Sequence, residues 1–238
     1  ECTPTQSAAQ CGSVLVLQYM IDEGKDPWCR TATRHTLLHL SYEKGHLEMI
    51  KFLLEKYPDM INELADCTKS AAHHVAEIGN ISVLQYLIDL GIDPRCRLAQ
   101  QATLLHISCI GGHLEMTKFL VEKYPDMINE ADDKKRTPAH YAACSSNVYV
   151  LQYIIDQGQN PLCVTAEHET LLHMSGLHGE LEITQYLHDK YPGMINMVTK
   201  NKQTPAHYAA KSSNLSVLLY LIAHGIDPWC RTIEQETL

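Results

Sequence analysis

Apolar residues in this chain recur at spacings of three and four, in short stretches separated by polar and glycine-containing segments. That spacing puts the apolar side chains on one side of an α-helix and predicts short amphipathic helices. The apolar stripe of one such helix consists of Val148, Val150, Leu151, Ile154 and Ile155. Gly158 is expected to end this helix. A first helix should begin at Pro138, because Thr137 can cap free backbone N–H groups and proline has no N–H to leave unpaired.

The same pattern returns at one constant interval along the whole chain, as in Leu17, Leu84, Leu151 and Leu218. A second series at the same interval, Thr36, Thr103, Thr170 and Thr237, divides each period into an odd unit and a slightly longer even unit. The predicted units span 3–35, 36–69, 70–102, 103–136, 137–169, 170–203 and 204–236. Units this short cannot bury an apolar face alone, so we expect one stacked solenoid. Because both ends fall inside the pattern, we expect the chain to be a fragment of a longer array.

These units resemble the ankyrin repeat. The family's signature, Thr-Pro-Leu-His-x-Ala, stands here as Thr137-Pro138-Ala139-His140-Tyr141-Ala142, and it recurs at 204–209 and 103–108. The glycine and histidine between the family's two helices appear as Gly45-His46 and Gly112-His113. The resemblance implies an all-α solenoid of helix-turn-helix units with hairpin loops. It also implies that partners bind at the hairpin tips and at the exposed end of each first helix.

Three features depart from the family's pattern. Even units have an extra residue after the second helix, in Lys-Tyr-Pro segments at 56–58, 123–125 and 190–192, which predicts stiffer, proline-held loops. The first unit has Gln6 in place of the signature histidine. Odd units carry other residues where the family has a hairpin asparagine, namely Trp28, Arg95, Leu162 and Trp229. The hydrogen bonds of that asparagine need another source in the odd units.

Charge and composition exclude several classes of function. The chain has 28 acidic and 19 basic residues, a net charge of −9, which disfavours binding to nucleic acid or to an anionic membrane surface. It contains no run of 18 apolar residues, so no membrane insertion is expected. Nine cysteines, an odd number without a Cys-x-x-Cys pair, fit a reducing, cytoplasmic compartment.

The histidines and cysteines are interpreted as structural. Six of the 14 histidines occupy the signature position: His39, His73, His106, His140, His173 and His207. The resemblance implies that these imidazoles hydrogen-bond the turns between units, and equivalent positions roughly 10 Å apart cannot share a metal ion. The periodic cysteines Cys29, Cys96, Cys163 and Cys230 are expected to pack as small hydrophobes. No catalytic or phosphate-binding motif is present, so we expect neither an enzyme nor a cofactor.

Candidate binding residues are those that vary at the end of the first helix, where the core positions repeat. They are Glu43, Lys44, Glu77, Ile78, Ile110, Cys144, Leu177 and His178. Exposed apolar side chains along one surface often mark an interaction groove, so Ile78, Ile110 and Leu177 are the candidate anchors. The alternative is that these three pack onto the adjacent helix or hairpin.

The even-unit hairpin tips form a basic edge on an otherwise acidic chain. Its members are Lys69, Lys134, Lys135, Arg136, Lys200 and Lys202. An acidic partner segment would complement this edge, whereas ordinary solvated loop charge is the alternative explanation.

The leading hypothesis is a scaffold that binds a protein or peptide on its concave face and hairpin tips. Two alternatives stay open: a mechanical or spacer array within a larger protein, and a targeting module of an effector or enzyme. The diversity at the first-helix ends favours binding, because a spacer has no reason to vary its groove selectively. The sequence leaves the oligomeric state open.

Overall fold

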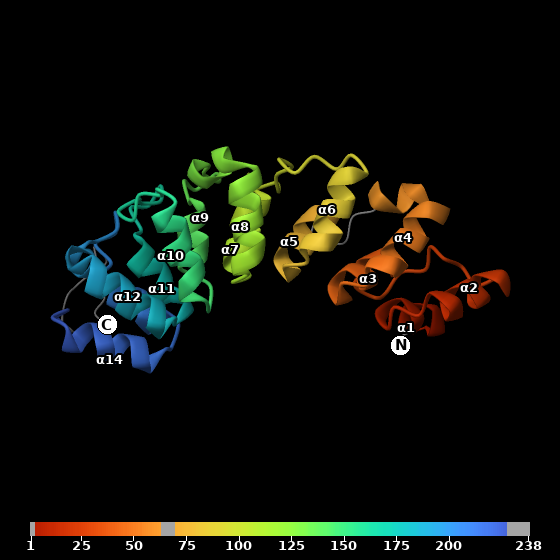
Figure 1. The fold of residues 1–238 in the computed structure, drawn as a ribbon. Helices are drawn as coiled ribbons and strands as arrows, with labels where there is room; N and C mark the ends of the chain where they lie inside the picture. Colours follow the sequence, from red (N-terminus) through yellow and green to blue (C-terminus); the bar gives the residue numbers. More distant parts are fainter. Residues whose placement is uncertain (1–2, 63–69, 228–238) are drawn as a thin grey trace. The chain divides into compact units, whose positions relative to one another are not determined.

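The computed structural model describes residues 3–62 and 70–227 and is built from short helices in pairs (Figure 1). The chain divides into two compact units, a first unit Glu1–Ala99 and a second unit Gln100–Leu238, and each of these compact units contains several repeats. The helices of the first unit are α1 (Pro4–Gln10), α2 (Val14–Asp22), α3 (Leu37–Lys44), α4 (Leu47–Lys56), α5 (Ala71–Ile78) and α6 (Ile81–Asp89). Those of the second are α7 (Leu104–Ile110), α8 (Leu114–Lys123), α9 (Pro138–Ala142), α10 (Val148–Asp156), α11 (Leu171–His178), α12 (Leu181–Lys190), α13 (Pro205–Lys211) and α14 (Leu215–Ala223).

Each unit has two layers of helices. In the first unit α1, α3 and α5 pack in sequence, and α2 packs on α4. In the second unit α7, α9, α11 and α13 pack in sequence, with α8, α10, α12 and α14 forming the other layer. The predicted all-α solenoid of helix-turn-helix pairs is confirmed, whereas the seven unit boundaries remain predictions.

The first helices begin with reciprocal caps built from the signature residues. Thr170 N–H donates to His173 Nδ1 at 3.2 Å, and His173 N–H donates back to the Thr170 hydroxyl at 3.4 Å. The first repeat has Gln6 in place of the histidine and still forms this cap, since Thr3 N–H donates to Gln6 Oε1 at 2.9 Å. Two backbone donors at the helix start are therefore satisfied in both versions.

The core lies between the layers. The apolar residues after the capping threonine are fully buried, as in Leu37, Leu104 and Leu171. The predicted stripe of α10 is buried at Val148, Val150, Leu151 and Ile154. Burying one side chain of this size contributes roughly 2 kcal/mol to the free energy of unfolding, compared with leaving it exposed.

The proline segments form short 3-10 helices, which the sequence pattern did not predict. They are η1 (Pro58–Asn62), η2 (Pro125–Asn129) and η3 (Pro192–Asn196). Each opens with a backbone bond to the carbonyl of the tyrosine before the proline, such as Met194 N–H to Tyr191 O at 3.0 Å. The methionine inside each segment, for example Met194, is buried and holds the loop against the core.

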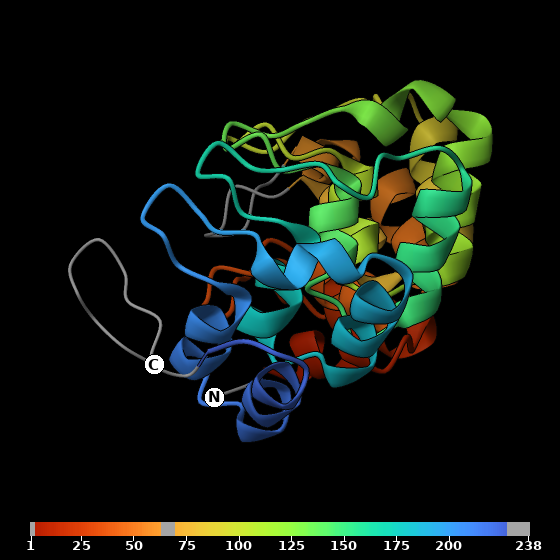
Figure 2. The same ribbon diagram turned by 90° about the vertical axis from the view of Figure 1, so that its left-hand side faces the viewer.

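The hairpins of the second unit are joined to each other through their backbones. Asp133 N–H donates to Gln100 O at 3.1 Å, and Ala166 N–H donates to Lys134 O at 2.8 Å. Lys200 N–H continues the series to Glu167 O at 3.1 Å. The loops at the edge of this unit accordingly lie side by side, as the turned view shows (Figure 2). Of the described helices, none combines the length and apolarity needed to cross a bilayer.

Candidate protein-binding surface

The first-helix ends of the first unit border a shallow, open depression of about 360 Å³. Its walls are the end of α3 with the end of α5 and the start of α6, and the lining residues are Glu43, Lys44, Gly45, Ile78, Gly79, Asn80, Ile81 and Ser82. Three candidate binding residues, Glu43, Lys44 and Ile78, are brought together here. The carboxylate of Glu43 lies 2.9 Å from His35 Nδ1, which fixes one polar wall of the depression. Glu77, the neighbour of Ile78, is exposed.

The equivalent first-helix ends of the second unit expose apolar side chains. Ile110 at the end of α7 is 38% exposed, and Leu177 near the end of α11 is 36% exposed. His178 follows Leu177 and is also exposed. Cys144 differs: it is buried, and its thiol donates to the His140 carbonyl at 3.2 Å. Burial raises the pKa of this thiol to about 12, so Cys144 is an unreactive thiol with little surface to offer a partner.

Side-chain amides hold these helix ends in place. Asn147 Nδ2 donates to Gly112 O at 2.8 Å, and Asn214 Nδ2 donates to Gly179 O at 3.0 Å. Both glycines have positive φ, and both follow directly on the exposed anchor segments. The ends of α7 and α11 are thus bonded to the next repeat, so Ile110 and Leu177 sit on ordered backbone.

Two of the signature histidines, His106 and His173, make the bond to the next hairpin that the resemblance implied. The backbone N–H of Thr103 donates to His106 Nδ1 at 3.1 Å, which leaves the proton of this ring on Nε2. That Nε2–H donates to the carbonyl of Arg136 in the next hairpin at 3.1 Å, and His173 bonds Gln203 O in the same way at 3.0 Å. Burial lowers the pKa of His173 to about 4. Among the described residues, no group of His, Cys, Asp and Glu is arranged to hold a metal ion.

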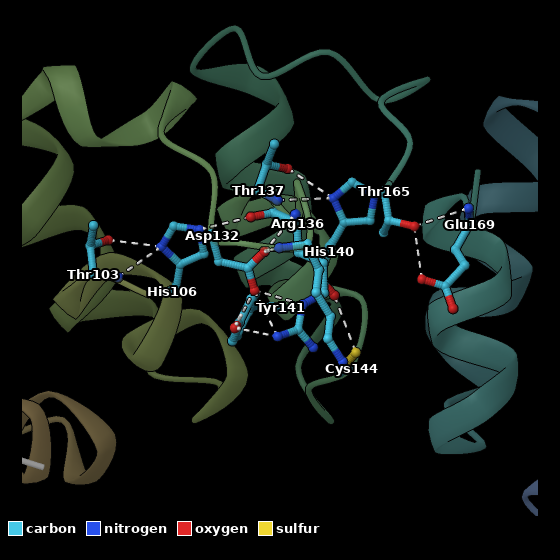
Figure 3. Close-up of polar contacts among 11 residues, drawn as sticks. Thr103, His106, Asp132, Arg136, Thr137, His140, Tyr141, Cys144, Thr165 and Glu169 are labelled. Atoms are coloured by element: carbon cyan, nitrogen blue, oxygen red, sulfur yellow. Dashed lines mark hydrogen bonds and ion pairs between the residues drawn. The ribbon is translucent and has the colours of Figure 1, made fainter. Parts of the chain in front are cut away.

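The basic residues of the hairpin tips divide into two groups. Lys134, Lys135, Lys200 and Lys202 are exposed, and Lys200 lies 3.6 Å from Glu167. Lys69 lies outside the described residues. Arg136 instead turns toward the repeat (Figure 3), where its guanidinium reaches the buried carboxylate of Asp132 at 2.7 Å.

Asp132 is the centre of a polar network that the sequence did not reveal. It accepts from Arg136 Nε at 2.7 Å and from the Tyr141 hydroxyl at 2.9 Å, and the tyrosine ring stands edge-on to His106 (Figure 3). Burial favours the neutral acid, but the donors of Arg136 and Tyr141 outweigh it and lower the pKa of Asp132. Arg136 is thereby committed to holding the hairpin on the helix. The four-residue separation of Asp132 and Arg136 was the only signal of this pairing in the sequence.

A different carboxylate takes this role one period later. There Tyr208 donates to Glu169 at 2.7 Å, and the Thr165 hydroxyl donates to the second oxygen of the same carboxylate at 2.8 Å.

Stacked helix pairs with capped starts and bonded hairpins define a helical repeat protein of the interaction-module class. A family model described as ankyrin repeats (3 copies) matches residues 5–98, 72–165 and 147–232. The chain belongs to the ankyrin-repeat family, whose repeats generally mediate protein–protein interaction and are not themselves catalytic.

The relatives are large and varied proteins. Alpha-latrocrustotoxin-Lt1a of Latrodectus tredecimguttatus is 26% identical over 92% of this chain, but the match covers 16% of the toxin. Nuclear factor NF-kappa-B p105 subunit of Gallus gallus is 30% identical over 52% of this chain and 13% of its own length. Palmitoyltransferase AKR1 of Lachancea kluyveri is 27% identical over 82% of this chain and 27% of its own length. The chain therefore spans less than a third of each of these relatives.

Proposed function

We propose that this chain binds a protein or peptide segment along the exposed ends of its first helices, with the hairpin tips contributing charge. The observation that carries the proposal is the depression in the first unit, because it is lined by Glu43, Lys44 and Ile78 from two neighbouring first helices. The depression is shallow and more polar than apolar, so Ile78 would supply an apolar contact while the polar groups fix the orientation of the partner.

The second unit supports the same proposal. Ile110 and Leu177 each expose more than a third of their surface at the corresponding helix ends. Apolar side chains held on ordered backbone lose little entropy on binding, which suits them as anchors. The same backbone order means that the surface needs no rearrangement to receive a partner.

The exposed lysines of the hairpin tips are the secondary element of the proposal. Lys134 and Lys200 stand at the edge of the loops and would attract an acidic partner segment over several ångströms. Arg136 contributes through hairpin structure instead, because its guanidinium is bound to Asp132. We also propose that the chain binds without catalysing a reaction and that it is located in the cytoplasm.

Affinity capture from native lysate tests the proposed surface. The variant Ile78→Ser, Ile110→Ser, Leu177→Ser removes the three anchors from partly exposed positions, so the fold should persist in circular dichroism. A matched control, Leu15→Ser, Tyr149→Ser, Leu219→Ser, removes apolar groups that are 84%, 62% and 55% exposed on second helices. We expect partners to be retained by the control and depleted about tenfold by the anchor variant. Equal capture by all three proteins contradicts the proposal and favours the spacer alternative.

A further inference from the structure

The loops that follow the second helices of the fifth and sixth repeats carry an apolar surface away from the first-helix ends. We call it the loop patch and define it by Leu162, Val164, Tyr191, Met197 and Val198. Leu162 is 53% exposed, Val164 36% and Val198 45%. Large apolar side chains gathered in loops cost solubility, so such a patch requires an explanation.

A depression of about 360 Å³ opens in the middle of the loop patch. It is lined by Leu162, Tyr191, Pro192, Gly193, Met194 and Met197. Met194 is fully buried and belongs to the core, whereas Pro192 and Gly193 are exposed at the rim. Gly193 keeps the rim low, and a Cβ built on it would meet no atom within 4 Å. The volume lies at the lower end of the range of small-ligand pockets, about 300 Å³, and suits one large side chain.

Backbone bonds bring the two halves of the loop patch together. Lys200 N–H donates to Glu167 O at 3.1 Å, so the loop containing Val198 runs beside the loop containing Val164. Thr165 and Thr199 are buried, and the residues that alternate with them point outward. Val164 and Val198 therefore face the same side of neighbouring extended segments.

Comparison with the preceding period shows that the fold does not need these apolar residues. The equivalent positions one period earlier are Arg95 for Leu162, Arg97 for Val164, Asp126 for Gly193, Glu130 for Met197 and Ala131 for Val198. Four charged residues have thus become Leu, Val, Gly and Met in loops of the same backbone design. Stability does not account for the change, because the charged version also folds.

The charges around the loop patch indicate what kind of segment would fit. Lys200 and Lys202 follow Val198 on the hairpin, and Lys190 precedes Tyr191. Glu167 and Glu169 on the neighbouring hairpin and Asp189 in α12 equal these three lysines in number, but the Glu169 carboxylate is held by Tyr208 and Thr165. The exposed charges of the two hairpins are therefore Lys200, Lys202 and Glu167, which leaves one positive charge in excess there. The lysines on the hairpin side complement acidic groups on a partner.

We propose that the loop patch is a docking site for a partner protein segment in which one large apolar side chain is followed by acidic residues. The apolar side chain enters the depression beneath Leu162 and Tyr191, and the acidic residues meet Lys200 and Lys202. The inference shares with the proposed function the class of partner, a protein, and the hairpin-tip lysine Lys200. It adds an apolar depression that lies away from the first-helix ends.

Selection from a library of short random peptides displayed on phage tests this assignment on the whole chain. The loop variant is Leu162→Arg, Val164→Arg, Gly193→Asp, in which every new side chain is the one found at the equivalent position of the preceding period, so its folding is expected to be normal. The anchor variant of the first-helix ends serves as the matched control. Fluorescence anisotropy with the enriched peptides gives the affinities.

We expect the selection to enrich peptides with a large apolar residue followed by acidic residues. Their affinity should fall at least about tenfold on the loop variant and stay unchanged on the anchor variant. Enriched peptides that bind the loop variant as well as the unmodified chain overturn the loop patch, and so does a selection without this motif. Peptides that depend only on the anchors would leave the proposed function standing while removing this inference.

Discussion

At the scale of single residues, His106 and His173 show how one side chain serves both a helix cap and a neighbouring hairpin. The ring of His173 accepts from Thr170 through one nitrogen and donates to Gln203 through the other. The bond from Thr170 requires the neutral imidazole, because a protonated ring has no acceptor, whereas the bond to Gln203 is possible in either state. Fold stability is thereby linked to the protonation of buried histidines.

Stability should fall as the pH falls from about 6.5 toward 4. Burial lowers the pKa of His39, His140 and His173 from 6.5 to about 4, with His74 and His35 adding repulsion at His39. The unfolded chain binds these protons first, so the histidine contribution is present above pH 6.5 and is lost on acidification, by at most about 3 kcal/mol per residue. Urea unfolding followed between pH 7.5 and 4.5 measures the effect.

Gln6 suggests the control for the pH experiment, since glutamine keeps the cap in the first repeat. The variant His39→Gln, His140→Gln, His173→Gln should show a clearly flatter dependence on pH. An unchanged slope in that variant would show that other groups, chiefly carboxylates, cause the acid sensitivity.

At the scale of elements, the turn between the two helices of a repeat is the point where neighbouring repeats lock. Gly179 ends α11 at a φ of +75°, and a methyl group there would collide with the side chain of Asn214. Gly158 follows α10 at a φ of +100° with nothing within 4 Å of an added Cβ. The two positions separate the cost of backbone strain from the cost of losing the contact between repeats.

Gly179→Ala is expected to destabilise the chain more than Gly158→Ala. Both substitutions carry a backbone cost of roughly 1 kcal/mol, and the first also displaces the Asn214 hydrogen bond, adding about 1–2 kcal/mol. Chemical denaturation of the two variants gives the difference. Equal losses of unfolding free energy in the two variants would mean that Asn214 moves aside freely and that its bond to Gly179 contributes little to stability.

Local signals in the sequence predicted the helices well but not the contacts between them. The constant period, the Thr-x-x-His caps and the stripe ending at Ile155 each depend on the order of residues along the chain, so they were readable directly. The 3-10 helices were missed because a proline after tyrosine fits several turn types. The inward turn of Arg136 was missed because it depends on the burial of Asp132. A buried carboxylate needs a charged partner, and its burial follows from packing between elements.

At the scale of the whole molecule, both compact units repeat one plan with different surfaces. Core positions keep their identity from period to period, while the first-helix ends and the loop patch change. The sequence identified Ile78, Ile110 and Leu177 as variable, and the structure adds that Ile110 and Leu177 are exposed and that Ile78 lines a depression. The loop patch escaped the sequence analysis because its residues come from two separate loops.

Hydrogen–deuterium exchange of the chain with a captured partner tests the central claim most directly. If the first-helix ends bind the partner, amides at 43–46, 77–80, 108–113 and 176–180 should exchange more slowly in the complex, while the second helices α10 and α12 keep their free rates. Protection confined to the second helices, or none in these segments, would contradict binding at the first-helix ends.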